Sequence, residues 1–217
     1  MMTANPSSKR ANPRSLRTRH SLVEAGLHLF AERPVDAVPI DDIVAAAGVA
    51  KGSFFNHFED KQKFAEAVAA DVRLVIEARV AQANKDLTDP LERLAGGMRV
   101  AVEFALTDLE RALVTVRAGS LVTGRSHPLN AGLRKDIEAA CAQGLLRKEA
   151  EHAGLLLWLS NCHWLMANVI EQKLSRARAA DRMRDMMVMA LIGLGVGEAK
   201  ARELANDSAA RLRASGK

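Results

Sequence analysis

The sequence predicts an all-α protein, with a small N-terminal module of three helices followed by a larger helical domain. The 217 residues are rich in strong helix formers, chiefly Ala, Leu, Arg and Glu. Apolar residues recur at intervals of three and four, as they do on one face of an α-helix. No segment shows the alternation of apolar and polar residues that marks a β-strand. We therefore expect about nine or ten helices and no sheet.

The first predicted helix begins near Leu16 and ends at Pro34, because proline cannot continue a helix. Its core-facing positions fall at i, i+3, i+4, i+7 and i+8. They are Leu22, Ala25, Gly26, Leu29 and Phe30.

Two shorter helices and a long one are predicted next. The second helix has Pro39 near its start and two acidic residues in its first turn. It ends at Gly48, which suits a left-handed C-terminal residue. A third, short helix is expected over about residues 50–57. Asp60 is placed to cap a long helix that runs to about Gln82.

The later helix starts are marked by capping residues. Asp89 precedes a proline and is followed three residues later by Glu92, and Thr107 and Glu110 repeat this spacing. The last four helices are expected at roughly 133–145, 149–174, 181–194 and 198–212, with three alternate glycines from Gly193 separating the final pair.

The net charge of +5 is concentrated at the N-terminus. Residues 1–19 carry no acidic residue and five basic ones: Lys9, Arg10, Arg14, Arg17 and Arg19. A disordered basic arm over residues 1–15 could contact phosphates or simply keep the chain soluble.

Other features favour an ordinary cytoplasmic protein. Cys141 and Cys162 stand in no metal-ligand or disulfide pattern, and the polar N-terminus does not resemble a leader peptide. Residues 153–170 carry no full charge, but Ser160 and Asn161 are among four polar interruptions, which favours a buried helix over a membrane span. We expect no metal and no cofactor.

The glycine-linked pair of short helices has the layout of a helix-turn-helix. Phe54 and Phe58 supply a core-facing side, and the small residues beside Gly48 allow close helix packing. The outward residues suit phosphates and base edges in a major groove. We expect the DNA-facing set to be Lys51, Gly52, Ser53, Phe55, Asn56, His57 and Lys61.

The stretch IVAAAGVAKGSFFNHFEDK, residues 43–61, resembles the signature of TetR-type regulators, and the resemblance covers roughly 16–76. It implies a DNA-binding domain over 16–76 and a ligand-binding and dimerisation domain over 77–217. It also implies a ligand-responsive repressor that binds a palindromic operator as a homodimer. Three positions depart from the usual pattern: Phe55 replaces a tyrosine, Pro39 a threonine and Pro34 a glycine, so particular phosphate contacts differ.

Two stripes of the C-terminal domain are candidates for the dimer interface, because their apolar residues recur at spacings of four and three. Ordinary core packing within one chain is the alternative. The interface candidates are Leu155, Leu159, Cys162, Met166 and Val169, then Met183, Met187, Ala190 and Leu194.

Another face of the helix over 149–174 mixes aromatic and amide groups, which suits a largely apolar effector pocket, or else core packing. The pocket candidates are Met98, Phe104, Trp158, Asn161, Trp164 and Asn168, with Leu157 and His163 beside them.

Two other functions remain open. A ligand-independent DNA-binding or interaction protein would share the same N-terminal module. A helical enzyme is the second alternative, although no nucleophile, metal-protease, P-loop or dinucleotide motif is present.

Overall fold

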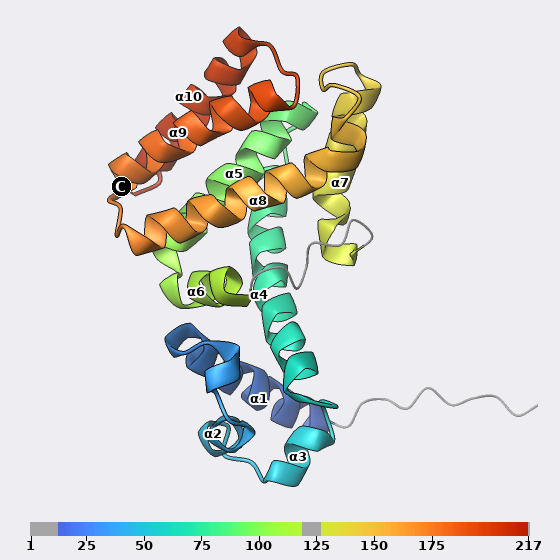
Figure 1. The fold of residues 1–217 in the computed structure, drawn as a ribbon, viewed down its shortest axis with the longest axis vertical. Coiled ribbons are helices and arrows are strands. Elements are labelled where there is room, and N and C mark those ends of the chain that lie inside the picture. Colours follow the sequence, from blue (N-terminus) through green and yellow to red (C-terminus); the bar gives the residue numbers. More distant parts are fainter. Residues whose placement is uncertain (1–12, 119–126, 217) are drawn as a thin grey trace, which may run out of the picture. The chain divides into compact units, whose positions relative to one another are not determined.

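A computed structural model describes residues 13–118 and 127–216. Within these ranges the chain forms ten α-helices and two short 3-10 helices, with no strand, which confirms the predicted all-α class (Figure 1). Contacts divide the chain into two compact units, Met1–Val68 and Ala69–Lys217, called unit 1 and unit 2 below. Most of the predicted basic arm lies outside the described residues.

Unit 1 contains three helices and the start of a fourth. The helices are α1 (Pro13–Glu32), α2 (Ile40–Ala46), α3 (Lys51–Phe55) and the first part of α4 (Lys61–Ala83), with the 3-10 helix η1 (Val35–Ala37) between α1 and α2. Arg33, just after α1, forms a 2.8 Å ion pair with Asp42 of α2. This contact ties the first two helices together beside the apolar core.

Four phenylalanines form that core. Phe54 of α3 lies 5.2 Å from Phe64 of α4 and 5.6 Å from Phe58, measured between ring centroids. Phe30 of α1 lies 5.7 Å from Phe64 in an edge-on arrangement. Rings at these separations gain packing energy beyond the burial of their area, so one cluster joins α1, α3 and α4.

Local chemistry sets the helix ends in unit 1 as predicted. Gly48 has a φ of 66°, the left-handed conformation that glycine adopts at little steric cost. The Asp60 side chain accepts a 2.7 Å hydrogen bond from the backbone N–H of Lys63 and caps α4. Pro39 occupies the N-cap position of α2, so the helix itself begins at Ile40.

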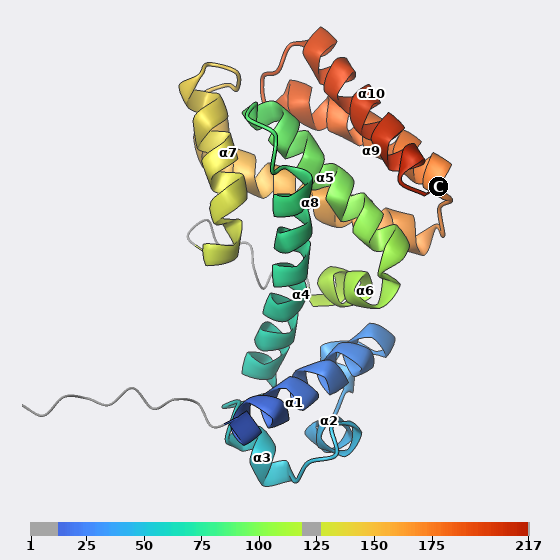
Figure 2. The same cartoon turned by 180° about the vertical axis from the view of Figure 1, so that it is seen from behind.

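Unit 2 contains the rest of α4 and six further helices. They are α5 (Pro90–Thr107), α6 (Leu109–Ala118), α7 (Ala131–Ala142), α8 (Ala150–Glu171), α9 (Arg176–Gly193) and α10 (Glu198–Ala214), with η2 (Pro128–Asn130) leading into α7. α8 packs against α5, α6, α7 and α9, and α9 packs along α10. α8 lies in front of α5 in Figure 1 and behind it in Figure 2.

A polar knot joins α4, α5 and α7. Arg93 of α5 forms a 2.6 Å ion pair with Asp136 of α7, and it also donates to the carbonyls of Asn84 and Leu87. Asn84, which is 1% exposed, donates back to the Arg93 carbonyl at 2.9 Å. These bonds satisfy backbone groups where α4 ends and fix α5 against α7.

The capping predictions in unit 2 have mixed outcomes. Asp89 accepts a 2.8 Å hydrogen bond from the backbone N–H of Leu91, with Pro90 at the first helical position, as predicted. The predicted cap at Thr107 is wrong. Thr107 is the last residue of α5, and its hydroxyl donates to the carbonyl of Glu103 at 2.9 Å.

One helix, Ala150–Glu171, is long and apolar enough to cross a membrane by length and composition. In the structure this helix, α8, instead has four neighbouring helices packed around it. Its apolar character is therefore accounted for by burial, together with an exposed face described below.

Candidate DNA-binding site

The α2 and α3 helices are joined by a short turn through Gly48, as a helix-turn-helix requires. The amide of Val49 donates to the carbonyl of Val44 at 3.0 Å, which closes the turn against the end of α2. Buried Phe54 and Phe58 anchor the inner side of α3. The opposite side of this short helix is consequently left for a partner.

The predicted DNA-facing residues fall into two groups. Lys51, Gly52, Phe55 and Asn56 are exposed, whereas Ser53, His57 and Lys61 are partly buried. Phe55 keeps 52% of its surface exposed although its neighbour Phe54 is fully buried. An exposed aromatic side chain on a short polar helix is available for contact with an apolar part of a partner.

The two lysines of this set already have partners in the chain. Lys51 Nζ lies 2.8 Å from Asp41 Oδ1, an exposed ion pair between α3 and α2. Lys61 Nζ donates to the carbonyls of Asp36 and Val38, at 3.1 and 3.4 Å. Lys61 therefore stabilises the loop before α2, a structural role that the sequence did not indicate.

One further basic residue, Arg19, is held beside α3, which the sequence did not indicate. The Arg19 guanidinium of α1 lies over the Phe58 ring, 5.4 Å from its centroid. A cation–π contact holds the charge near the C-terminal end of α3. Its only sequence signal was membership of the basic N-terminal run.

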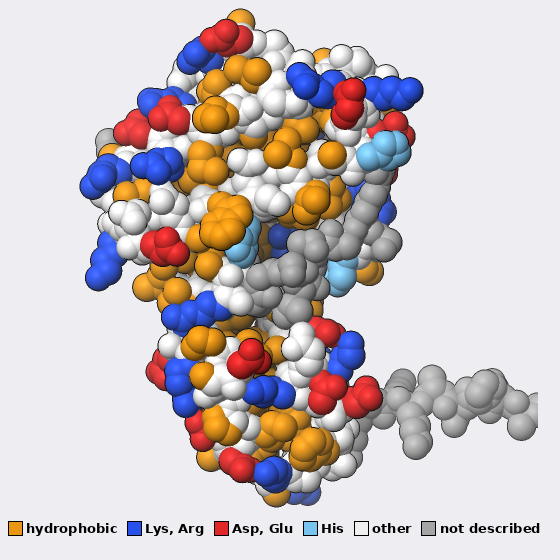
Figure 3. Space-filling view, in the orientation of Figure 1, with side chains coloured by type: hydrophobic (Ala, Val, Ile, Leu, Met, Phe, Trp, Pro, Cys, Tyr) orange, Lys and Arg blue, Asp and Glu red, His pale blue; other side chains and the backbone are white. Residues whose placement is uncertain are grey.

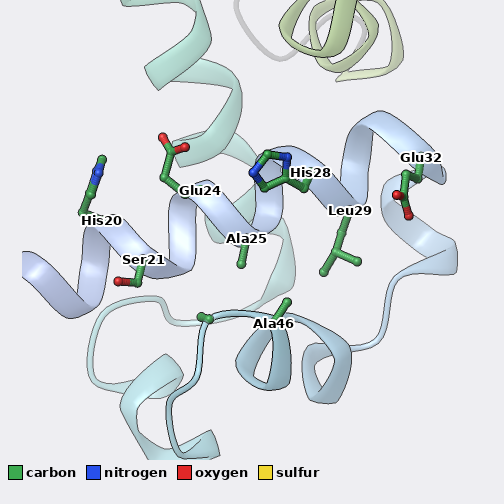
Figure 4. A pocket seen from close by; sticks show the side chains of 9 residues that line it. His20, Ser21, Glu24, Ala25, His28, Leu29, Glu32 and Ala46 are labelled. Carbon is green, nitrogen blue, oxygen red and sulfur yellow. The ribbon is translucent and has the colours of Figure 1, made fainter.

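A groove of 410 Å³ lies on another part of unit 1 and is lined by α1 and α2 (Figure 4). Ser21, Ala25 and Leu29 of α1 point toward Ala46 of α2, while His20, Glu24 and His28 project away from it.

Within the described ranges, no group of three or more His, Cys, Asp or Glu residues is arranged to hold a metal ion.

The predicted effector-pocket residues divide into buried and exposed ones. Met98, Phe104 and Trp158 are buried, at 0%, 0% and 2% exposure. Trp164 is 66% exposed, and Leu157, predicted beside it, is 39% exposed. Trp164 and Leu157 of α8 therefore point outward, away from the buried members of the set.

The two amides of that set bond along or between helices. Asn161 donates to the carbonyl of Leu157 in its own helix at 2.9 Å. Asn168 accepts a 3.1 Å hydrogen bond from Arg182 of α9. His163 is partly buried, and burial lowers the pKa of its imidazole.

The predicted dimer stripe is largely buried within the chain. Met183 and Met187 are fully buried within unit 2, and Leu159 and Cys162 are partly buried. The remaining members are buried as well: Leu155, Met166, Val169, Ala190 and Leu194. Their burial within one chain favours the alternative of ordinary core packing.

Comparisons with known proteins agree with this architecture. The family model for bacterial regulatory proteins of the tetR family matches residues 22–68, which span α1 to the start of α4. This N-terminal part of the chain is therefore similar to the corresponding part of tetR-family regulators. Two curated relatives are transcriptional repressors.

The first of these relatives is DhaR of Mycobacterium sp. (strain GP1), 35% identical over 86 residues, covering 39% of this chain and 43% of DhaR. The second is KstR2 of Mycolicibacterium smegmatis (strain ATCC 700084 / mc(2)155), 33% identical over 78 residues, covering 36% of this chain and 38% of KstR2. The chain thus spans about two fifths of the length of these curated relatives.

A solved structure extends the likeness over both units. The crystal structure of RolR in complex with resorcinol is 25% identical, with a TM-score of 0.68, and the match covers 88% of this chain and 94% of RolR.

Proposed function

We propose that this chain is a cytoplasmic, ligand-responsive transcriptional repressor that binds a palindromic operator as a homodimer. The observation that carries the proposal is the two-sided α3 helix, with Phe54 fully buried and Lys51, Gly52, Phe55 and Asn56 exposed. The repressor activity of DhaR and KstR2 supports it. A helix of this kind can place its outer side chains in a major groove.

The experiment is selection of bound sequences from a random DNA pool by the purified chain at near-physiological salt. An enriched inverted repeat with half-sites about 34–36 Å apart, or a multiple of this spacing, is expected from two related recognition helices. Failure to enrich any sequence with folded protein, and in the presence of cell extract, would count against sequence-specific binding.

The dimer face is proposed to lie on the exposed side of α8 and α9. The bond between Asn168 and Arg182 fixes the antiparallel register of this helix pair. Because the two helices run antiparallel, the part of α8 before Asn168 lies beside the part of α9 after Arg182. The exposed apolar residues met there are Leu156, Leu157 and Trp164 on α8, and Met189 and Ile192 on α9.

Figure 3 shows hydrophobic side chains gathered over α8 and α9. Exposed apolar side chains in one area mark interaction surfaces, and a twofold interface uses the same patch on both subunits. A second copy of this chain is therefore the proposed partner, and dimerisation would give DNA binding its twofold symmetry.

Sedimentation velocity tests this face. Trp164→Glu combined with Met189→Glu should convert the dimer to monomer, because two charges per subunit would be buried in an apolar interface. Leu74→Glu, at an exposed leucine of α4, is the matched control. Dimers of unchanged stability in the double variant would contradict the assignment.

The effector is proposed to be a small, largely apolar molecule bound within unit 2. The support is the resorcinol complex of RolR, whose fold matches along most of this chain. An effector that favours one arrangement of the two recognition helices would shift the chain between bound and released states.

A further inference from the structure

A partly buried polar cluster in unit 2 has no part in the DNA-facing or dimer surfaces. Arg73 and Glu77 lie one turn apart on α4, and Arg73 Nη2 is 2.7 Å from Glu77 Oε1. Arg73 also donates a 3.3 Å hydrogen bond to Oδ1 of Asn130. Asn130 is fully buried and immediately precedes α7. The arginine is therefore held by groups from two separate elements.

The surroundings of this ion pair are poorly solvated. The Arg73 and Glu77 side chains keep 19% and 27% of their surface. Burial raises the pKa of Glu77 although Arg73 lowers it. Burial also raises the pKa of the Cys162 thiol on α8 to about 12, and both charges act on this thiol. The ion pair of α4 is thus joined to η2 by the bond to Asn130, and its charges act on a thiol of α8.

Arg73 retains an unused donor in this setting. Its Nε is buried and has no hydrogen-bond partner among residues 13–118 and 127–216. A buried donor without an acceptor is unfavourable, so an acceptor oxygen brought by a bound molecule would gain affinity from it. Glu77, when ionised, accepts hydrogen bonds only, and its two oxygens offer more sites than the contact with Arg73 uses.

We propose that Arg73 and Glu77, positioned by Asn130, form the polar anchor of the effector site, and that the effector is a neutral molecule with a hydroxyl group on an apolar body. This inference rests on the proposed function. A hydroxyl accepts from Arg73 and donates to Glu77 at once. A carboxylate would be repelled by Glu77, and a hydrocarbon would leave the Arg73 Nε without an acceptor.

The test is calorimetric titration of the full chain with three probes of similar size: phenol, benzoate and toluene. The variants are Arg73→Lys and Glu77→Gln. Arg134→Lys and Glu138→Gln are matched controls, because this pair has the same spacing on α7 but is 35% and 50% exposed. Circular dichroism checks that each variant is folded, and the Nε–H resonance of Arg73, assigned from the Lys variant, reports direct contact.

Phenol is expected to bind at millimolar concentration or better and to shift the Arg73 resonance. Its affinity should fall by about an order of magnitude in Arg73→Lys but stay within about twofold in both controls. Glu77→Gln should raise benzoate affinity relative to phenol, because the negative charge is replaced by an amide donor. A loss of affinity caused only by altered packing would not shift the preference from phenol toward benzoate.

Three results would overturn the anchor: no binding of phenol, equal binding of phenol and toluene, or an Arg73→Lys affinity equal to that of the controls. DNA binding is measured separately, without probes. A chain that binds phenol as expected but enriches no DNA sequence would contradict the proposed function and leave the anchor standing. A chain that enriches a DNA sequence but does not bind phenol would contradict the anchor and leave the proposed function standing.

Discussion

Replacing Phe54 tests whether the recognition helix depends on the phenylalanine cluster of unit 1. The side chain is fully buried and lies within 5.6 Å of Phe58 and 5.2 Å of Phe64, between ring centroids. Truncating such a residue to alanine removes its burial and leaves a cavity, at a cost of about 3–5 kcal/mol. Phe54→Ala should therefore raise the unfolded population of unit 1 by roughly three orders of magnitude.

Phe55→Ala is the matched control, because it removes the same side chain from the next residue. Phe55 is 52% exposed and makes an edge contact with Phe54 at 5.3 Å. Its truncation should cost about 1 kcal/mol or less, although it should weaken DNA binding if this ring meets the operator.

Hydrogen–deuterium exchange followed by mass spectrometry is the suitable assay. Both tryptophans, Trp158 and Trp164, belong to unit 2, so tryptophan fluorescence would not follow unit 1 directly. Peptides from α1, α3 and the start of α4 should lose protection in Phe54→Ala and keep it in Phe55→Ala. Equal loss in both variants would refute the argument that one face of α3 is anchored and the other free.

Three further predictions concern packing, the polar knot and a thiol. Gly26→Ala should destabilise unit 1 by about 1–2 kcal/mol in chemical denaturation, because an added Cβ would clash with Phe64 and lie 2.9 Å from Val68; a stabilised variant would contradict this packing. Asp136→Asn should cost about 2–3 kcal/mol by the same measurement, since it removes the charged partner of Arg93, and a change below about 0.5 kcal/mol would refute its role. Burial raises the pKa of the Cys162 thiol to about 12, so this thiol should stay protonated at pH 8. It should therefore be alkylated roughly a thousandfold more slowly in the native chain than in urea. Comparable alkylation rates would show that the thiol is accessible and ionised.

Much of unit 1 could be predicted from sequence because its signals are local. A glycine with positive φ, an aspartate cap and prolines at helix boundaries each act within a few residues, and Gly48 and Asp60 behave as expected. Thr107 failed because a cap-like spacing does not show whether the preceding helix has already ended; here α5 runs through Thr107 itself.

The faces of α8 and α9 were harder to predict for a physical reason. Both sides of α8 carry apolar residues, and periodicity alone does not say which side meets the rest of the chain and which meets a partner. Met166 lies on the buried side of α8, and Trp164 is left outside. The proposed polar anchor was missed because Arg73 and Glu77 have the spacing of an ordinary surface ion pair, and only the tertiary fold partly buries them.

The most direct test of the central claim is to repeat the random-pool DNA selection with a variant that combines Ser53→Ala and Asn56→Ala. These substitutions alter the outer side of α3 without touching its buried ring, Phe54. If α3 reads bases, the inverted repeat enriched by the unmodified chain should lose sequence preference at symmetric positions in both half-sites, with the spacing between them unchanged. An identical repeat from both proteins would show that this face of α3 does not determine the sequence read.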